Sequence, residues 1–334
     1  MMSSRRRLII EETTRLARGV GKVVLFFYVP ATLILTLNYF PYDTDPSIGR
    51  AASAGSGMAS PAIHRSASFY ESAYRAETAE KRGLDYEKVA RAAAEGMNVE
   101  PAVRKFVNDY GLERKRVLEV GSGRGYLQDV VEDYVGLDLS SKVARFYHKR
   151  FVAGSATEMP FPDSSFDAIW SIWVLEHIPE PERALMEMRR VLKPGGLLYL
   201  APAWNCTPWA ADGLEVRPFS DFNWRGKLVK ASVPIQRFPF IQLMHVFPAR
   251  GIRWAQYKWS GDTTRLRFHA LDANYETYWQ PDSDAAVSLD RFETYLWFRS
   301  RGDECLNCIG KKDVFAEFAS PLVIRAAKKS SNQA

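Results

Sequence analysis

The chain has few cysteines, and this scarcity excludes two kinds of protein. Three cysteines in 334 residues cannot form the dense disulfide framework of a small secreted scaffold, so a reducing compartment is favoured. Cys305 and Cys308 form a CxxC pair, but no second pair completes a zinc site. We therefore interpret both as small, half-buried side chains. The five histidines show no paired spacing, so no metal site is predicted.

Acidic residues are too few to balance the basic ones, but the excess is concentrated in one place. The net charge is +6, with a pI near 9.1. Residues 1–22 contain six lysines and arginines against two glutamates, a balance of +4. Because most of the excess lies in this tail, the charge does not indicate a nucleic-acid-binding surface, and no nucleic-acid partner is expected.

Residues 23–42 contain no charged side chain, in the run "VVLFFYVPATLILTLNYFPY". A helix of this length would measure about 30 Å, the thickness of the hydrocarbon core of a bilayer. The run predicts a membrane segment, with a buried helix of a soluble protein as the alternative. A cleaved signal peptide is disfavoured, because no small-x-small cleavage pattern follows the run directly.

The charges flanking this segment predict a cytoplasmic N-terminus, since basic residues precede it and Asp43 and Asp45 follow it. A simple span would then export the rest of the chain. Pro30 lies near the middle and can break the helix, so that the segment dips into the membrane and returns. Both topologies remain open. We favour membrane association with a cytoplasmic main domain.

Composition divides the chain into five predicted parts. Residues 1–42 are the basic tail and membrane segment, and residues 43–68 are a linker rich in Ala, Ser, Gly and Pro. Residues 69–202 contain leading helices and a cofactor-binding half-domain. Residues 203–285 form an insertion, and residues 286–328 a helix and strands that complete the domain.

From residue 116 the pattern alternates between strand and helix, which indicates a doubly wound, mostly parallel α/β sheet. Strands are predicted at 116–120, 134–138, 151–155, 166–173 and 196–202, and helices at 125–133, 140–150 and 180–192. "LKPGG" at 192–196 predicts a turn. After the insertion, we expect a helix at 288–302 and strands at 304–310 and 320–328, with an antiparallel strand at the C-terminus.

The first strand ends in a glycine-rich turn, "VLEVGSGRGY". Gly121, Gly123 and Gly125 form GxGxG rather than the dinucleotide pattern GxGxxG, in which Tyr126 would be the third glycine. Glycine patterns alone are weak evidence. This one is strengthened by Glu119 before the loop and by Asp138, which ends the next strand and can bind two ribose hydroxyls.

These residues resemble the class I S-adenosylmethionine-dependent methyltransferases, in particular the type 11 domain group. The resemblance is carried by "VLEVGSGRG" (117–125), "VGLDLS" (135–140), "GSATEMPFPDSSFDAIWS" (154–171), "VLEHIPEP" (174–181) and "LKPGGLLYLAP" (192–202). It implies a Rossmann-like methyltransferase sheet and S-adenosylmethionine as the cofactor.

The resemblance also implies where the cofactor binds. Glu119 and the backbone from Gly121 to Gly125 would border the methionine part, Asp138 would hold the ribose, and residues 155–157 would edge the adenine. The predicted cofactor-binding residues are Glu119, Gly121, Ser122, Gly123, Gly125, Tyr126, Asp138, Leu139, Ser155, Ala156 and Thr157. The family commonly has an acidic residue where this chain has Ser155, and a neutral hydrogen bond there would be weaker.

S-adenosylmethionine has no phosphate to place on a helix N-terminus, so the glycines would allow close approach of the backbone. Its cationic sulfonium suits carboxylate and aromatic surroundings. Tyr70 and Tyr74 precede the first strand at helical spacing, where they could cover the cofactor or pack in the core.

Methyl transfer from a sulfonium releases a neutral thioether, so the leaving group needs no acid and the enzyme mainly aligns the reactants. A hydroxyl acceptor benefits from a base. His177 in "LEHIPEP" follows a strand end and is the candidate catalytic residue. The alternative is that His177 and Glu176 only shape the loop.

The insertion has seven basic and no acidic residues between Phe222 and Gly261, interleaved with aromatic ones. This mixture suits an anionic membrane surface, an anionic substrate or RNA, and the predicted membrane segment favours a membrane or a lipid-linked acceptor. A lid with solvated charges is the plainer alternative. We therefore predict a membrane-associated methyltransferase acting at oxygen, carbon or nitrogen of a small or lipid-linked acceptor. A silent scaffold and an RNA methyltransferase are the alternatives.

Overall fold

A computed structural model of the chain describes residues 61–74, 85–236, 239–260 and 263–327, together with residues 19, 21, 22 and 26. For residues 61–64, 235, 236 and 239–245 only the backbone is described. Apart from residue 26, the predicted membrane segment lies outside these ranges, as does most of the predicted linker. Of the helices within the described ranges, none combines the length and the apolar character that a membrane crossing requires.

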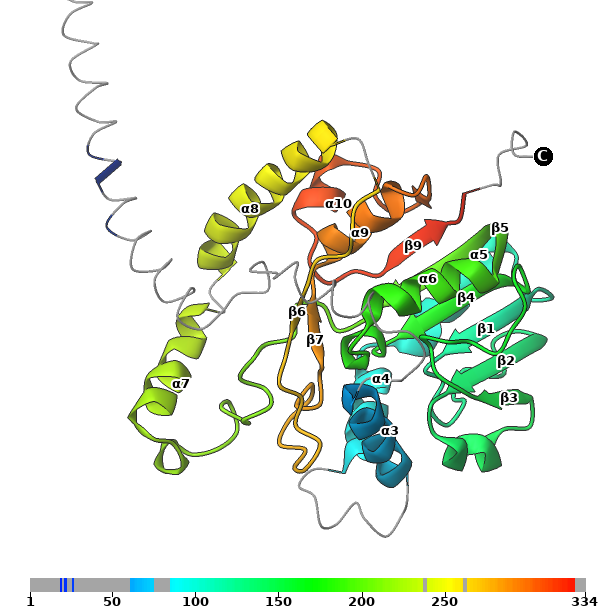
Figure 1. Cartoon of the computed structure of the whole chain (residues 1–334), viewed down its shortest axis with the longest axis horizontal. Helices are drawn as coiled ribbons and strands as arrows, with labels where there is room; N and C mark the ends of the chain where they lie inside the picture. Colours follow the sequence, from blue (N-terminus) through cyan, green and yellow to red (C-terminus); the bar gives the residue numbers. More distant parts are fainter. Residues whose placement is uncertain are drawn as a thin grey trace, which may run out of the picture.

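A seven-stranded sheet forms the centre of the described structure (Figure 1). Its strands are β1 (Arg116–Val120), β2 (Asp133–Asp138), β3 (Arg150–Ala153), β4 (Phe166–Ile172), β5 (Leu192–Ala201), β8 (Glu304–Cys305) and β9 (Leu322–Arg325). Their order across the sheet is β3-β2-β1-β4-β5-β9-β8. The first five strands are parallel, and β9 is antiparallel to both of its neighbours. The predicted fold class is confirmed.

Each face of the sheet has its own apolar core, because successive side chains of a strand point to opposite faces. Trp170 of β4 belongs to the core on one face, with α5 (Val99–Tyr110). The adjacent Ile169 belongs to the core on the other face, with α6 (Pro181–Val191) and α9 (Arg291–Arg299). The sheet is therefore doubly wound, with strand order reversing beside β1. Ligands of such sheets bind at the carboxyl ends of the strands near this reversal.

The segment 125–133, predicted as a helix, forms a series of turns instead. The backbone amides of Gln128 and Val130 donate to carbonyls three residues earlier, at 3.1 and 3.0 Å. Leu127 and Val130 are buried, so the turns satisfy the apolar spacing that had indicated a helix. Gly125 itself cannot begin a helix, because its φ of +70° lies outside the right-handed helical region.

Two further predictions are partly wrong. The predicted helix 140–150 is a short 3₁₀ helix, η2 (Ser141–Phe146). The predicted strand 304–310 shortens to two residues, because a disulfide joins Cys305 to Cys308 and closes the chain into a turn. Both cysteines are half-buried, as predicted, but their bonding was not anticipated.

The two helices before the first strand form where helices were predicted. They are α4 (Tyr86–Gly96) and α5, and Gly111 ends α5 with a φ of +62°.

The "LKPGG" segment, predicted as a turn, belongs to β5. The pairing of β5 with β4 shifts register there, so the segment forms an irregularity in the strand.

Within its described residues, the insertion forms two α-helices, the short 3₁₀ helix η4 (Phe219–Asp221) and one strand of a small second sheet. The helices are α7 (Trp224–Gln236) and α8 (Pro239–Ser260). β6 (Phe268–Ala270) pairs antiparallel with β7 (Val287–Leu289), which leads into α9. Figure 1 shows α7 and α8 on the opposite side of the molecule from β1, β2 and β3.

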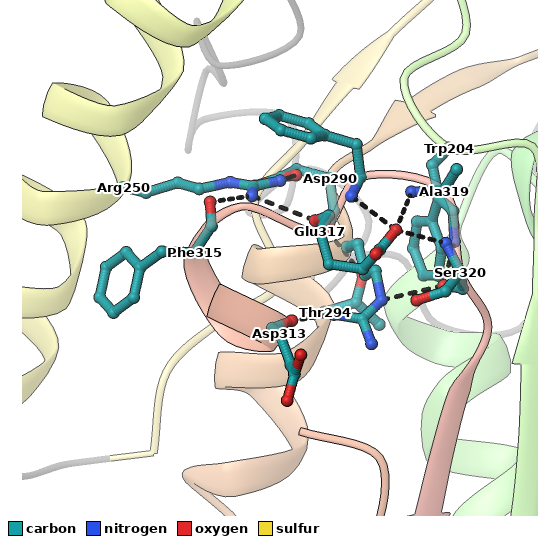
Figure 2. A network of polar contacts seen from close by, with 11 residues as sticks. Trp204, Arg250, Asp290, Thr294, Asp313, Phe315, Glu317, Ala319 and Ser320 are labelled. Carbon is teal, nitrogen blue, oxygen red and sulfur yellow. Dashed lines mark hydrogen bonds and ion pairs between the residues drawn. The ribbon is translucent and has the colours of Figure 1, made fainter. Parts of the chain in front are cut away.

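A buried polar network fixes α8 to α9 (Figure 2). The Arg250 guanidinium binds Asp290 with an N–O distance of 2.5 Å and donates to the carbonyl of Phe315 at 2.6 Å. One helical turn further on, Arg253 binds Glu293 at 2.8 Å. Both arginines are buried. Two of the seven basic residues of the insertion therefore belong to the protein interior, and the surface is less basic than the sequence indicated.

Candidate active site

The glycine loop after β1 has a backbone that side chains could not occupy. Gly121, Gly123 and Gly125 all have positive φ, at +73°, +50° and +70°. A Cβ on Gly121 would lie 2.1 Å from a methyl carbon of Val174, and one on Gly125 would lie 2.7 Å from the Tyr147 ring. The loop therefore needs glycine both for its conformation and for the close approach of its neighbours.

Asp138 ends β2 and holds the glycine loop in place. Its carboxylate accepts hydrogen bonds from the backbone N–H of Gly123 at 2.8 Å and of Ser140 at 2.9 Å. Burial raises the pKa of Asp138, while the donors of Ser140 and Gly123 act in the opposite direction. The side chain also lines the cavity described next, where it can accept hydrogen bonds from a ligand.

A cavity opens at the carboxyl ends of β1, β2, β3 and β4, beneath α3 (Pro61–Ala73) and the start of α4. It is lined by Ser66, Tyr70, Tyr74, Tyr86, Gly121, Leu137, Asp138, Leu139, Gly154, Ser155, Ala156, Thr157, Trp173, Val174, His177, Ile178 and Pro179. It lies where the topology of the sheet predicts a ligand. Trp173 adopts a φ of +54°, a strained conformation for so large a residue and one that concentrates at functional sites.

Three tyrosines form the wall opposite the strands. Tyr70 lies on α3, Tyr74 directly follows it, and Tyr86 begins α4. The ring centroid of Tyr86 lies 6.0 Å from that of Tyr70 and 6.4 Å from that of Tyr74. The rings meet at steep angles, in the edge-to-face arrangement that aromatic pairs prefer. The wall thus presents aromatic surface, which attracts a cation such as a sulfonium.

His177 lies at the end of η3 (Leu175–His177), and its side chain is only 11% exposed. Its Nδ1 lies 3.4 Å from both the backbone carbonyl and the Oδ2 atom of Asp284. Because a carbonyl oxygen only accepts, Nδ1 carries the proton, and the neutral ring has its lone pair on Nε2. Asp284 Oδ2 also accepts a hydrogen bond from Tyr70 at 2.7 Å, which joins α3 to the histidine.

The charges around His177 are mainly negative. Burial lowers the pKa of His177, but Asp284, Glu176 and Asp282 raise it, and the net direction is upward. Burial raises the pKa of Glu176 to about 7. Glu176, His177 and Asp282 offer nitrogen and oxygen atoms within 4.8 Å of one another, a spacing that could accommodate a metal ion. No metal was predicted from the sequence, and chelation can test for one.

The structure brings together only part of the predicted set. Gly121, Asp138, Leu139, Ser155, Ala156, Thr157 and His177 line the cavity, whereas Glu119, Ser122, Gly123, Gly125 and Tyr126 do not. Glu119 is buried beneath the loop, where Tyr134 donates to it and burial raises its pKa to about 8. Tyr126 is 53% exposed and donates to Glu87 at 3.3 Å.

Sequence reasoning missed Tyr86, Trp173 and Asp284. Tyr86 followed a helix-capping aspartate and carried no further signal. Asp284 lies 107 residues after His177, near the end of the insertion, and the sequence does not pair the two.

The sheet order, the glycine loop and the carboxylate that ends β2 are those expected of a class I S-adenosylmethionine-dependent methyltransferase domain. Residues 118–200 match the family model of the type 11 methyltransferase domain. The fold and this match together support a methyltransferase domain in this part of the chain.

Individual relatives match about a third of the chain or less. Demethylmenaquinone methyltransferase from Renibacterium salmoninarum is 42% identical over 96 residues, or 26% of this chain and 40% of that protein. Fatty-acid O-methyltransferase from Mycolicibacterium smegmatis is 39% identical over 114 residues, or 29% and 42% of the two chains. This chain thus spans about two fifths of each relative. An amino pentose methyltransferase from Micromonospora echinaspora, solved with bound S-adenosylmethionine, is 23% identical over 35% of this chain and 56% of that one, with a TM-score of 0.31.

Proposed function

We propose that this protein is a membrane-associated enzyme that transfers a methyl group from S-adenosylmethionine to a small or lipid-like acceptor. The observation that carries the proposal is the cavity in which the glycine loop, Asp138 and the three tyrosines of the opposite wall meet. The names of the two relatives support an apolar acceptor, because one acts on demethylmenaquinone and the other on fatty acids.

The residues present fit the cofactor. Asp138 offers a carboxylate to the ribose hydroxyls, and residues 155–157 form the part of the cavity proposed for the adenine. Gly121 leaves space that a Cβ would fill, so the backbone can approach the methionine part. Glu119, which lies beneath the loop, would act indirectly by supporting it. When bound, S-adenosylmethionine supplies an electrophilic methyl group on a positively charged sulfur.

We assign His177 the role of base for a hydroxyl acceptor. In the neutral ring Nε2 carries the lone pair. Nε2 lies 3.8 Å from Glu176 Oε1, and no hydrogen bond engages it among the described residues. It can therefore take the proton of an acceptor hydroxyl as that oxygen forms its bond to the methyl carbon. Asp284 positions the ring through Nδ1 and stabilises the imidazolium that results.

Tyr70 extends this arrangement to the wall of the cavity. Its hydroxyl donates to the carboxylate that orients His177, and its ring lies 6.0 Å from the imidazole. Docking of α3 and orientation of the base therefore depend on one carboxylate, Asp284. Loss of this carboxylate should affect both cofactor binding and the acceptor step.

Binding and transfer can be tested separately. Calorimetry should show binding of S-adenosylmethionine to the full chain, and Asp138→Ala should abolish it. His177→Asn should keep binding but lose transfer of radiolabelled methyl groups to cellular lipid fractions. His148→Asn is the matched control, because His148 is exposed and pairs with Asp129.

Several results would contradict this function. Absence of cofactor binding by the unaltered chain would favour a silent scaffold, and label confined to RNA would overturn the acceptor class. Transfer that is lost on chelation and restored by Mn²⁺ would assign the group around His177 to a metal ion instead of a base.

We also propose that residues 23–42 attach the chain to the membrane with its main domain in the cytosol, where S-adenosylmethionine is made. A reporter fused after residue 334 should be active only on the cytosolic side. Activity on the opposite side would exclude the re-entrant topology.

A further inference from the structure

The polarity of α8 is reversed relative to that of an ordinary surface helix. Val246, Arg250, Arg253 and Tyr257 follow one another at steps of four, three and four residues, so they share one face. Val246 is fully buried, Arg250 is 1% exposed and Arg253 is 8% exposed. The face that contacts the protein therefore contains two arginines, whose charges are neutralised by acidic residues of α9 and of the position just before it.

The opposite face of α8 is apolar and exposed. Pro248, Ile252, Ala255 and Trp259 follow the same steps of four, three and four residues, about half a turn away from the buried face. Ile252 is 62% exposed and Trp259 is 93% exposed. We call these four residues the outer stripe. Surface helices normally place such residues inward and their charges outward, so the reversal indicates a partner for the stripe.

The charge around the outer stripe shows which partner fits. No acidic residue lies between Phe222 and Gly261. After the two buried arginines are set aside, Lys258 on α8 and Arg225 and Lys227 on α7 remain exposed. A second copy of the chain meeting the stripe across a two-fold axis would bring these positive charges together, which is unfavourable. An anionic lipid surface is attractive both to the charges and to the stripe.

We propose that the outer stripe of α8 docks onto an anionic membrane surface, with Trp259 and Ile252 at the boundary between headgroups and acyl chains. Trp224 at the start of α7 is 67% exposed and adds an amphipathic ring of the kind found at this depth. The proposal rests on the membrane association proposed above. It adds a contact surface within the enzyme domain, separate from residues 23–42.

A fluorescent probe on the stripe can test the contact. Ala255→Cys places a thiol within the stripe, where it can be labelled with an environment-sensitive nitrobenzoxadiazole group. The native thiols should not compete, since Cys206 is buried and the other two cysteines form a disulfide. Met97→Cys is the control, because Met97 is 68% exposed at the end of α4. The full chain is reconstituted into vesicles of phosphatidylcholine and phosphatidylglycerol in equal parts.

The two probes should respond to opposite quenchers. We expect nitroxide-labelled lipid to quench the probe at residue 255, and aqueous iodide to quench the probe at residue 97. Adding Ile252→Ser and Trp259→Ser to the labelled chain should weaken lipid quenching at residue 255 several-fold and increase iodide quenching. Vesicles of phosphatidylcholine alone should give weaker lipid quenching.

Three results would overturn the docking proposal. Iodide quenching at residue 255 as strong as at residue 97 would show a solvent-exposed stripe. Protection from both quenchers would show that protein covers the stripe, either a segment of the same chain or a second copy. Lipid quenching that the two serine substitutions leave unchanged would show that the stripe does not make the contact. Calorimetry with S-adenosylmethionine on the same labelled chain tests the proposed activity independently.

Discussion

Replacing Gly121 with alanine tests the glycine loop directly. The added Cβ would lie 2.1 and 2.6 Å from the two methyl carbons of Val174, whereas carbon atoms normally approach to about 3.5–4.0 Å. Holding a side chain at a φ of +73° costs about 1–2 kcal/mol, and overpacking adds about 1–3 kcal/mol. We expect a loss of about 2–5 kcal/mol in the free energy of unfolding, together with weaker cofactor binding.

Two further substitutions separate these effects. Gly111→Ala introduces a side chain at a φ of +62° where nothing lies within 4 Å, so it should cost only about 1–2 kcal/mol and leave cofactor binding unchanged. Val174→Ala removes the two methyl carbons that the Cβ added at position 121 would strike. Combined with Gly121→Ala, it should recover part of the lost stability and binding, leaving the cost of the backbone conformation.

Urea denaturation and calorimetry with S-adenosylmethionine provide both measurements for the four variants. The reasoning fails if Gly121→Ala is no more destabilising than Gly111→Ala, or if it binds the cofactor as the unaltered chain does. It also fails if Val174→Ala adds its own cost to that of Gly121→Ala without recovery, because a steric conflict makes the two substitutions non-additive.

Three other variants have defined outcomes. Burial raises the pKa of Glu119 from an ordinary 4.5 to about 8 in the fold. The free energy of unfolding should therefore fall as pH rises from about 4.5 to 8, by roughly 5 kcal/mol at most, because the folded state holds the proton more tightly than the unfolded state. Glu119→Gln should flatten the dependence of the free energy of unfolding on pH between about 5 and 8. Arg250→Met removes the buried guanidinium that binds Asp290 and should cost about 3–5 kcal/mol in urea denaturation. Ser155→Asp should tighten cofactor binding about tenfold by calorimetry, since a charge-assisted hydrogen bond replaces a neutral one. An unchanged pH dependence in Glu119→Gln, an unchanged urea midpoint in Arg250→Met, or an unchanged cofactor affinity in Ser155→Asp would contradict these expectations.

The inner strands of the central sheet were predictable because each is covered on both faces and must be apolar. β4 contains Ala168, Ile169 and Trp170 in succession, and the two cores divide them between opposite faces. The turns at 125–133 were not predictable, because the apolar spacing of Leu127 and Val130 suits a helix equally well. Gly125 has a φ of +70°, outside the right-handed helical region, and sequence periodicity does not reveal this angle.

Part of the candidate site could likewise be predicted from the sequence, and part could not. Asp138 and the glycine loop could be predicted because they are adjacent to strands whose ends must meet. Asp284 could not, because its position depends on how the end of the insertion folds back against η3. The sequence also overestimated the basic surface of the insertion, because it does not distinguish Arg250, which is 1% exposed, from Lys258, which is exposed.

The proposed membrane contact and the proposed base are connected through a short length of backbone. Arg250 of α8 binds Asp290, the residue that follows β7 and precedes α9. Just before β7, the amide of Ala286 donates to the carbonyl of Glu176 at 2.8 Å, which ties this segment to η3 and His177. Buried ion pairs and backbone hydrogen bonds at these points resist displacement, because breaking one leaves a charge or a polar group unpaired. A chain docked through the outer stripe would therefore hold its cavity in one orientation to the bilayer, so that a lipid acceptor would always approach the base from the same direction.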